Sequence, residues 1–358
     1  METRLAPALA PTALVAAISA AVTELRAGNP VALPTETVYG LAADAMRPEA
    51  VVKIFEAKER PFFDPLIVHL PNEEWLDRIT AIPAESRAVV SALIERFWPG
   101  PLTLVLPRRD NVPDIVTSGL PTVAVRMSAN PVFRAVCSAF GKPLAAPSAN
   151  RFGRISPTTA AHVNTELGGR VPLILDGGPT EHGVESTIVK VDGADLRVLR
   201  AGPVTPEELA AVWRAVREAE GEAPTDAQVA EFFGRLIATA TSSEEPAVEA
   251  PGQLQSHYAP TTPLRLLPEK LSFLPSEDDT RRVGILVFWK PPTGKHYAQV
   301  EILSSKGDLR EAAATLFAKM RNLDEARLDL IYAESVPEEG LGIAIMDRLR
   351  KAAAQHVQ

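Results

Sequence analysis

Two cations, Lys58 and Arg60, stand at the end of a helical pattern over residues 48–58, just before Pro61. The ordinary interpretation is that cations at a helix C-terminus favour the negative end of the helix dipole. The functional interpretation is an anion clamp, in which lysine supplies a point charge and arginine a fork that can bind phosphate or carboxylate at two points. The pair alone does not decide between them.

A run of small residues, 143–147, leads into Ser148 and Asn150. In an extended chain alternate side chains share a face, so this hydroxyl and this amide point the same way. Small residues before them let a ligand approach the backbone closely. A simple turn would explain the stretch equally well on its own.

Hydroxyl groups also gather beside predicted strands in two further segments. The stretch LPTETVYGL, residues 33–41, carries Thr35, and the stretch GVESTIV, residues 183–189, carries Ser186. Arg126 stands in an apolar strand pattern, where a guanidinium must find a carboxylate or phosphate or leave the core. Because open α/β sheets bind their ligands at strand ends, these groups together predict a cavity for an anionic substrate.

Other kinds of chemistry have no sequence signal here. There is no G-x-x-x-x-G-K-[ST] loop, no G-x-G-x-x-G after a strand, and no obvious Ser–His–Asp or Cys–His arrangement. The single cysteine, Cys137, cannot form an internal disulfide, and we expect a buried structural thiol. This inventory suits binding of an anion and stabilisation of charge rather than covalent catalysis.

The elements that must position these residues alternate between strand and helix patterns, which indicates an α/β domain of about 200 residues. Apolar runs predict strands at 31–33, 66–70, 102–106, 123–127, 173–175 and 187–191. Helices are predicted between several of them and at 206–218 and 226–240. The direct passage from 187–191 into 196–199 predicts an antiparallel pair.

A length of 358 residues favours two domains. We predict a catalytic domain over 1–240, a linker over 241–262 and a second α/β domain over 263–358. The linker is rich in Pro, Ser and Glu, but it also holds Gly252, His257 and Tyr258, which a mere tether rarely does.

Composition is that of an ordinary globular protein, with 46% hydrophobic and 23% charged residues. The net charge of −8 argues against a protein whose whole surface grips nucleic acid. Residues 5–23 carry no charge, but they lack the positive region of a signal peptide and show helical apolar spacing. We therefore expect a cytoplasmic protein with an amphipathic N-terminal helix and no membrane contact.

In combination these motifs resemble the Sua5/YrdC family, in its long Sua5 type. The family's K-x-R…S-x-N tetrad matches Lys58, Arg60, Ser148 and Asn150. Residues 33–41 and 183–189 look like its P-T-E-T-x-Y-G-L and G-x-E-S-T-[IV]-[IV] signatures. Residues 251–260 are similar to its P-G-M-x-x-x-H-Y-x-P linker, and 340–350 to its C-terminal domain. Two departures are Gln253 in place of Met and Asp64 before Pro65 in place of Asn.

The resemblance implies a YrdC-like open, twisted, mixed sheet with helices, joined by the linker to a smaller Rossmann-like α/β domain. It implies a nucleotidyltransferase that makes L-threonylcarbamoyladenylate from L-threonine, bicarbonate and ATP, releasing pyrophosphate. Mg²⁺ is expected with the ATP phosphates and water, with no metal ligand from the protein's side chains. The product would pass to the machinery that modifies adenosine 37 of tRNA; tRNA binding by this chain is possible but not required.

The resemblance also implies roles for individual residues. Lys58 and Arg60 would be catalytic, neutralising the triphosphate or carbamate. ATP would be bound by Lys58, Thr122, Ser148, Asn150, Ser156 and Arg200, with Tyr258 as a lid. Threonine would be bound by Thr35, His69, Arg126, Ala146 and Ser186. Arg126 would pair with the amino-acid carboxylate, and His69 is a hypothetical general base for the amine.

Two other functions compete with this one. An RNA-binding module of the same fold would show steeply salt-dependent RNA binding without ATP or threonine, which the net charge disfavours. A carbamoyl-transfer domain of the hydrogenase-maturation type normally accompanies zinc-finger modules, and this chain has one cysteine.

Overall fold

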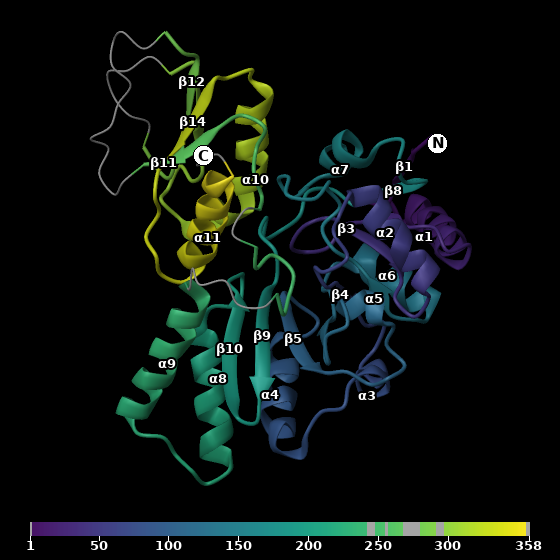
Figure 1. Ribbon diagram of the computed structural model, residues 1–358, viewed down its shortest axis with the longest axis vertical. Helices are drawn as coiled ribbons and strands as arrows, with labels where there is room; N and C mark the ends of the chain where they lie inside the picture. Colours follow the sequence, from purple (N-terminus) through teal and green to yellow (C-terminus); the bar gives the residue numbers. More distant parts are fainter. Residues whose placement is uncertain (1, 242–247, 255–256, 268–279, 291–296, 356–358) are drawn as a thin grey trace.

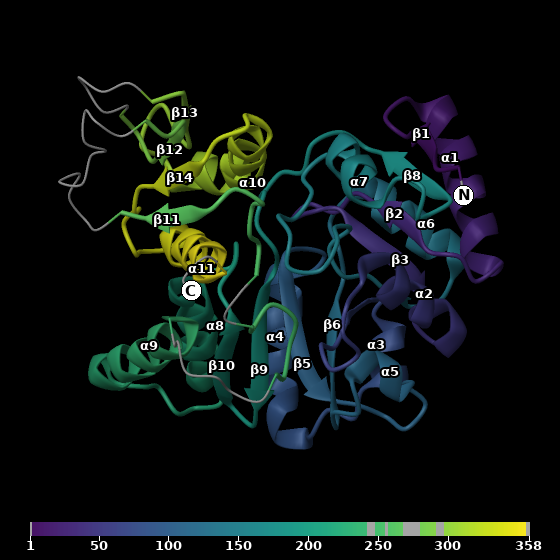
Figure 2. The ribbon, with the colours of Figure 1, turned by 45° about the horizontal axis from the view of Figure 1, so that its top comes forward.

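A computed structural model describes residues 2–241, 248–254, 257–267, 280–290 and 297–355. The chain forms two units, each built on its own sheet (Figures 1 and 2). The N-terminal unit has a ten-stranded sheet and helices α1 to α9, and the C-terminal unit has a four-stranded sheet and helices α10 and α11. This is the mixed α/β architecture with a second α/β unit that the sequence predicts. The first six residues of the predicted linker after α9, 242–247, lie outside the described residues.

The large sheet is mixed, with the strand order β1-β8-β2-β3-β7-β4-β6-β5-β9-β10. Its strands are β1 (Arg4–Pro7), β2 (Val31–Leu33), β3 (Gly40–Asp44), β4 (Ile67–His69), β5 (Leu102–Pro107), β6 (Thr122–Arg126), β7 (Leu144–Ala145), β8 (Leu173–Asp176), β9 (Thr187–Asp192) and β10 (Asp195–Arg200). Strands β4 and β6 run parallel, and β9 pairs with β10 in the predicted antiparallel way.

Several helices of the N-terminal unit begin where the sequence supplies proline or a capping side chain. The helices are α1 (Pro11–Arg26), α2 (Pro48–Lys58), α3 (Glu74–Ile79), α4 (Arg87–Phe97), α5 (Asp114–Thr117), α6 (Pro131–Phe140), α7 (Ala160–Leu167), α8 (Pro206–Ala219) and α9 (Asp226–Thr241). Asn130 accepts from two backbone N–H groups at the start of α6, and Thr205 forms a capping box with Glu208 on α8. Pro48 at the start of α2 likewise explains why this helix has the predicted bounds 48–58.

The small sheet is all parallel among its described strands, in the order β11-β14-β12-β13. Its elements are β11 (Leu264–Leu266), β12 (Val283–Val287), β13 (Gln299–Ile302), α10 (Leu309–Glu325), β14 (Leu330–Ala333) and α11 (Leu341–Ala354). Figures 1 and 2 both place α11 between this sheet and the α8–α9 end of the N-terminal unit. Helix α11 therefore faces the N-terminal unit, as does α10, whose Arg321 pairs with Glu166 at 3.1 Å.

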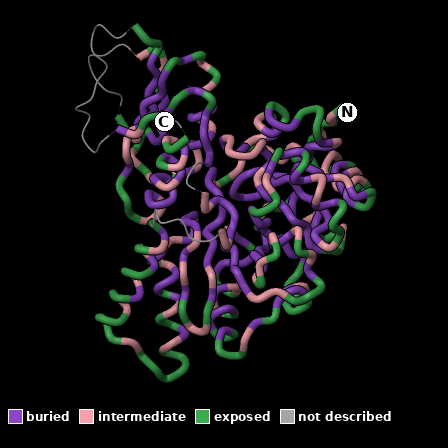
Figure 3. The backbone as a smooth tube through the Cα atoms, viewed as in Figure 1, coloured by how far each residue is buried: buried purple, intermediate pink, exposed green. Residues whose placement is uncertain are grey.

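Buried positions run through the centres of both units, whereas exposed positions follow the outer turns of α8 and α9 (Figure 3). Cys137 is buried, as predicted. Nowhere in the described ranges does a helix combine the length and the apolar character needed to span a bilayer.

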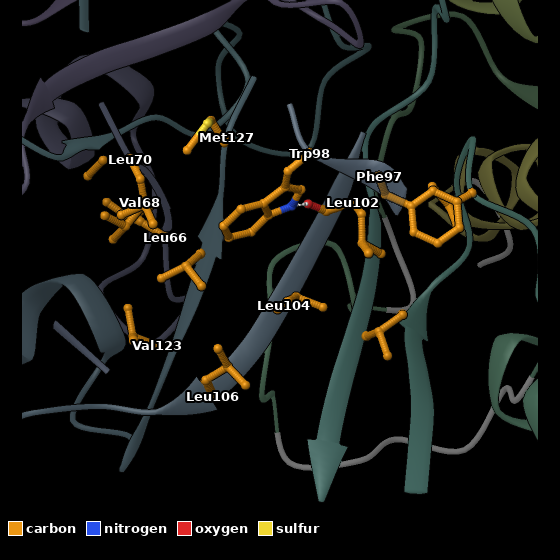
Figure 4. Packing of buried hydrophobic residues seen from close by; sticks show 14 of the residues in the cluster. Leu66, Val68, Leu70, Phe97, Trp98, Leu102, Leu104, Leu106, Val123 and Met127 are labelled. Atoms are coloured by element: carbon orange, nitrogen blue, oxygen red, sulfur yellow. Dashed lines mark hydrogen bonds between the residues drawn. The ribbon is translucent and has the colours of Figure 1, made fainter. Parts of the chain in front are cut away.

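The central core packs against one face of the large sheet around Trp98 and Leu104 (Figure 4). Trp98 donates its indole N–H to the carbonyl of Leu102 at 2.8 Å, which satisfies its one polar atom inside the core. Leu104 on β5 is fully buried.

We expect Leu104→Ala to lower the free energy of unfolding by about 2–5 kcal/mol, because it removes buried methyl groups and leaves a cavity. Chemical denaturation measures this, with Val15→Ala as the control, since Val15 is 69% exposed. A loss below about 0.5 kcal/mol for Leu104→Ala would contradict this description of the core.

Candidate active site

A cavity opens where strands of the large sheet end beneath the linker. His69 and Arg126 are opposite each other at the ends of the parallel strands β4 and β6, and Arg200 ends β10. The cavity is lined by Thr35, Thr37, Val38, Gly40, Arg60, Ile67, His69, Arg126, Ala146, Pro147, Ser148, Glu185, Ser186, Arg200, Pro251, Gly252, His257 and Tyr258. Nine of these side chains or backbone positions were predicted as site residues.

Lys58 lies directly behind the cavity wall and joins both halves of the predicted tetrad. Its Nζ donates to the carbonyl oxygens of Ser148 and Asn150, at 2.5 Å each. Burial, and then the charge of Arg60, hold the pKa of Lys58 well below its ordinary value. A buried ammonium group is stabilised when an anion binds near it, so Lys58 is suited to pair with an anionic substrate.

The turn between Lys58 and Arg60 depends on a residue in an unusual conformation. Glu59 caps helix α2 with φ 54°, in the left-handed region that non-glycine residues adopt uncommonly. The turn ends the helix and sends Arg60 to the cavity, where Asp64 pairs with it at 2.8 Å. Arg60 also donates to the carbonyl of Pro65 at 2.9 Å. The departure from the family pattern at Asp64 therefore gives Arg60 a carboxylate partner.

On the β4–β6 side, Arg126 is held by the PTET stretch. Its guanidinium donates to Glu36 at 2.5 Å and to the Thr37 hydroxyl at 3.1 Å. Burial would raise the pKa of Glu36, but the charge of Arg126 and the hydroxyl of Ser128 bring it down to about 2. Nε of Arg126 has no hydrogen-bond partner among the described residues. Of the possibilities that the apolar strand pattern left open for Arg126, the structure shows a buried carboxylate partner, Glu36, and the Nε donor stays available.

On the β9–β10 side, Arg200 is fixed by three acceptors. It donates to the Ser186 carbonyl and hydroxyl at 3.1 Å each, and to the Pro251 carbonyl at 3.3 Å. Because Pro251 belongs to the linker, this arginine connects the sheet to the segment that covers the cavity.

The linker closes the cavity from above. Tyr258 is buried with φ 63°, and its ring packs against Phe317 of α10 with centroids 5.7 Å apart. Gly252 has φ +80°, and a Cβ there would come within 2.5 Å of the Tyr258 hydroxyl. Only glycine combines that backbone conformation with this approach, which explains the pairing of Gly252 and Tyr258 in one linker.

Comparisons with known proteins identify the family once this geometry is in place. A family model described as "Telomere recombination" matches residues 23–202, and one described as "Threonylcarbamoyl-AMP synthase, C-terminal domain" matches residues 204–354. The chain is 41% identical to the threonylcarbamoyl-AMP synthase of Bacillus subtilis, over 95% of this chain and 94% of that one. It belongs to the long, Sua5-type threonylcarbamoyl-AMP synthases.

Structural comparison agrees across both units. The crystal structure of Pyrococcus abyssi Sua5 complexed with L-threonine superposes with a TM-score of 0.80 and 34% identity, over 99% of this chain and 98% of that one. The predicted fold class and the predicted nucleotidyltransferase activity are therefore confirmed for this member of the Sua5 type. The RNA-binding module without catalysis is not needed to explain the chain.

Not every predicted residue reaches the cavity of this synthase. Asn150 is buried behind it with Lys58, and Ser156 touches it through Glu185, to which it donates at 2.5 Å. Thr122 lies at the opposite end of β6 from Arg126, four residues and about 13 Å along the strand. The structure does not bring Thr122 to the other predicted ATP-binding residues.

Sequence reasoning assigned no role to Glu185 and His257, which line the cavity, or to Glu36 and Asp64, which pair with its arginines. Glu36 and Glu185 stand in quoted motifs, but each pairs with an arginine that is distant in the sequence. Asp64 pairs with Arg60 four residues before it. The available signal was electrostatic, because several cations in an apolar region need carboxylates as partners.

His69 is placed to contact a substrate but poorly placed to titrate. Its ring packs on Phe133 with centroids 4.5 Å apart, and burial, followed by the charge of Arg126, lowers its pKa to about 3. The imidazole is therefore neutral throughout the range from pH 5 to 8 and is a weak base.

We expect that His69 contributes no ionisation near pH 6.5 to the pH profile of kcat. The profile of His69→Asn should therefore have the same shape as that of the wild type in this range. Steady-state rates between pH 5 and 8 measure this, with His162→Asn as the control on a half-buried histidine outside the cavity. An inflection near 6.5 that only His69→Asn removes would instead support the general-base hypothesis.

Proposed function

We propose that this cavity aligns carbamylated L-threonine with ATP and that its cations stabilise the charge that develops on the α-phosphate. The observation that carries the proposal is that cations stand on both sides of one cavity. Arg126 lies on the β4–β6 side, while Arg60 and Arg200 lie near the tetrad and the linker. That arrangement suits two anionic substrates rather than one.

Threonine would bind on the β4–β6 side. The donor left over on Arg126 would take the amino-acid carboxylate, while the hydroxyls of Thr35 and Thr37, 2.8 Å apart, would face the substrate's hydroxyl. The complex of the Pyrococcus abyssi relative with L-threonine supports L-threonine as the amino acid that binds here. Ala146 and Ser148 also line the cavity.

The reaction then needs alignment more than a protein nucleophile. The neutral threonine amine adds to the carbon of CO₂ and releases a proton, or adds to the carbon of bicarbonate and releases water, and either reaction gives a carbamate. A carbamate oxygen attacks the α-phosphorus of ATP, and the bond to the bridging oxygen breaks to release pyrophosphate. Correct alignment of this kind contributes up to about 7–11 kcal/mol to lowering the barrier. Lys58, Arg60 and Arg200 would neutralise the phosphates, as arginine and lysine do in phosphoryl transfer.

Mg²⁺ fits this site only as a companion of the nucleotide. Among the described residues, no three His, Cys, Asp or Glu side chains are grouped as a metal site. The carboxylate that lines the cavity, Glu185, is already bound by Ser156 and Arg348. The ion would therefore be held by phosphates and water, and we assign no step of the mechanism to it.

The test is pyrophosphate release from ATP and bicarbonate with L-threonine, with L-serine and without amino acid. We expect release that depends on the amino acid and is fastest with L-threonine, because the extra methyl group is worth about 1–3 kcal/mol in an apolar pocket. Release at the same rate without amino acid would contradict the proposal. The product is expected to feed tRNA modification in the cytoplasm.

A further inference from the structure

Helix α11 of the C-terminal unit carries a cation that is buried inside the N-terminal unit. Arg348 is 0% exposed and heads the fully buried side chains by size. Its Nε donates to Glu185 at 3.0 Å, and one terminal nitrogen donates to the carbonyl of Ala201 at 2.7 Å. Both acceptors belong to the large-sheet unit, so a residue 163 positions from Glu185 supplies its charge partner.

Glu185 is the group through which Arg348 can affect the reaction. Glu185 lines the cavity, and its other carboxylate oxygen accepts from Ser156 at 2.5 Å. A bare carboxylate there would repel the phosphates of ATP and would be costly to bury. Arg348 removes that repulsion and holds the carboxylate in one orientation, while its guanidinium carbon lies 5.3 Å from the ring centroid of Tyr258.

A second cation of the same helix holds the linker. Lys351, one turn beyond Asp347 on α11, donates from Nζ to the carbonyl of Gly252 at 2.7 Å and pairs with Asp347 at 2.7 Å. The backbone N–H of His257 donates to the carbonyl of Lys351 at 3.4 Å. Gly252 and His257 both line the cavity. Two parts of the cavity lining, Glu185 and the linker, are thus held in place by side chains of the C-terminal unit, Arg348 and Lys351.

We infer that helix α11 completes the ATP side of the active site, with Arg348 as a positioning residue for Glu185 and Tyr258, and Lys351 as a positioning residue for the linker. This assigns the C-terminal unit a part in nucleotide binding. The inference rests on the proposed function, because it requires ATP to bind beside Glu185.

The test compares Arg348→Met with Arg350→Met in the full-length chain. Arg350 lies on the same helix, but its side chain is 46% exposed and pairs with Glu338. We expect Arg348→Met to lower kcat/KM for ATP at least tenfold while leaving the Kd for L-threonine within about threefold, since Arg126 and Thr35 do not contact α11. Arg350→Met should stay within twofold of the wild type on both measures.

Three further variants separate positioning from folding. Glu185→Gln, added to Arg348→Met, should recover several-fold of the lost kcat/KM for ATP, because it removes the unpaired charge. Lys351→Met should raise the KM for ATP more than it lowers kcat. If Arg348→Met does not fold, Arg348→Lys replaces it, because lysine keeps the charge but cannot reach Glu185 and Ala201 with a planar fork.

The inference is wrong if Arg348→Met, or Arg348→Lys in its place, folds and retains the wild-type kcat/KM for ATP. It is also wrong if Arg348→Met folds and loses activity, and Glu185→Gln added to it gives no recovery. Failure of the wild type to release pyrophosphate in response to L-threonine would instead overturn the proposed function itself.

Discussion

Replacing Lys58 by methionine should lower kcat for pyrophosphate release by about 10²–10³-fold or more. Removal of one preorganised donor from the site of developing charge typically costs that much, and Lys58 also supplies positive charge when bound phosphates favour its charged form. Two backbone carbonyls, of Ser148 and Asn150, would lose their donor as well. We therefore expect the loss to appear in kcat and in the KM for ATP.

The matched control is Lys53→Met on the same helix. Lys53 is half-buried and donates to the Asn29 side chain at 2.8 Å, outside the cavity. The Lys53→Met enzyme should retain the wild-type rate of pyrophosphate release. Retention of L-threonine binding by Lys58→Met, measured by calorimetry, would show that the cavity is still formed. A Lys58→Met enzyme within tenfold of the wild type would remove Lys58 from the mechanism.

The lowered pKa of Lys58 gives this prediction a pH dependence. A lysine with a lowered pKa loses its charge at a lower pH than an exposed lysine, so ATP binding should weaken as pH rises through that value. Phosphates that bind beside Lys58 favour its charged form, and ATP binding should therefore take up protons when the starting pH is near or above the lowered pKa. Calorimetry in buffers of different ionisation enthalpy measures that uptake, and Lys58→Met should abolish it.

The second large effect concerns the threonine side. Arg126→Met should weaken L-threonine binding at least 100-fold. Truncating one member of a buried charge pair costs about 2–5 kcal/mol, and the remaining carboxylate of Glu36 would repel the amino acid's own carboxylate. Stability should also fall, since Glu36 would be buried without its partner.

The double variant Arg126→Met/Glu36→Gln separates these two consequences. Removing the unpaired charge should restore much of the thermal stability, whereas L-threonine binding should stay weak because its cationic partner is still missing. Calorimetric titration and thermal unfolding on the same samples measure both. Wild-type L-threonine affinity in the double variant would exclude Arg126 as the carboxylate partner.

The sequence predicts most of the elements because local signals mark them. Helix α6 begins with proline at its first helical position and ends at Gly141, which has a left-handed conformation. Alternating apolar residues mark β9 and β10. Strands β1 and β13 were missed because they are short and half-exposed, and β3 because its five buried residues follow directly on a polar turn. Periodicity carries little information over so few residues.

Much less of the site follows from local pattern. The meeting of Lys58 with Ser148 and Asn150 joins residues about 90 positions apart, and only the family resemblance predicted it. Glu36 and Glu185 are bound by arginines 90 and 163 positions away, and no local signal specifies which carboxylate meets which cation. Thr122 lies at the end of β6 away from Arg126 and does not line the cavity, so its predicted role in ATP binding stays a prediction. The domain boundaries at 240 and 262 stay predictions, although α9 ends at Thr241 and β11 begins at Leu264.

The most direct measurement is a crystal structure of the enzyme with L-threonine and an ATP analogue that resists cleavage between the α- and β-phosphates. The account predicts both ligands in the one cavity, with the amino-acid carboxylate on Arg126 and the phosphates facing Arg60, Arg200 and the Lys58 side. The threonine nitrogen should lie about 5 Å from the α-phosphorus, which leaves room for the carbamate carbon and oxygen. Ligands in separate cavities, or phosphates bound away from Lys58 and Arg60, would contradict it.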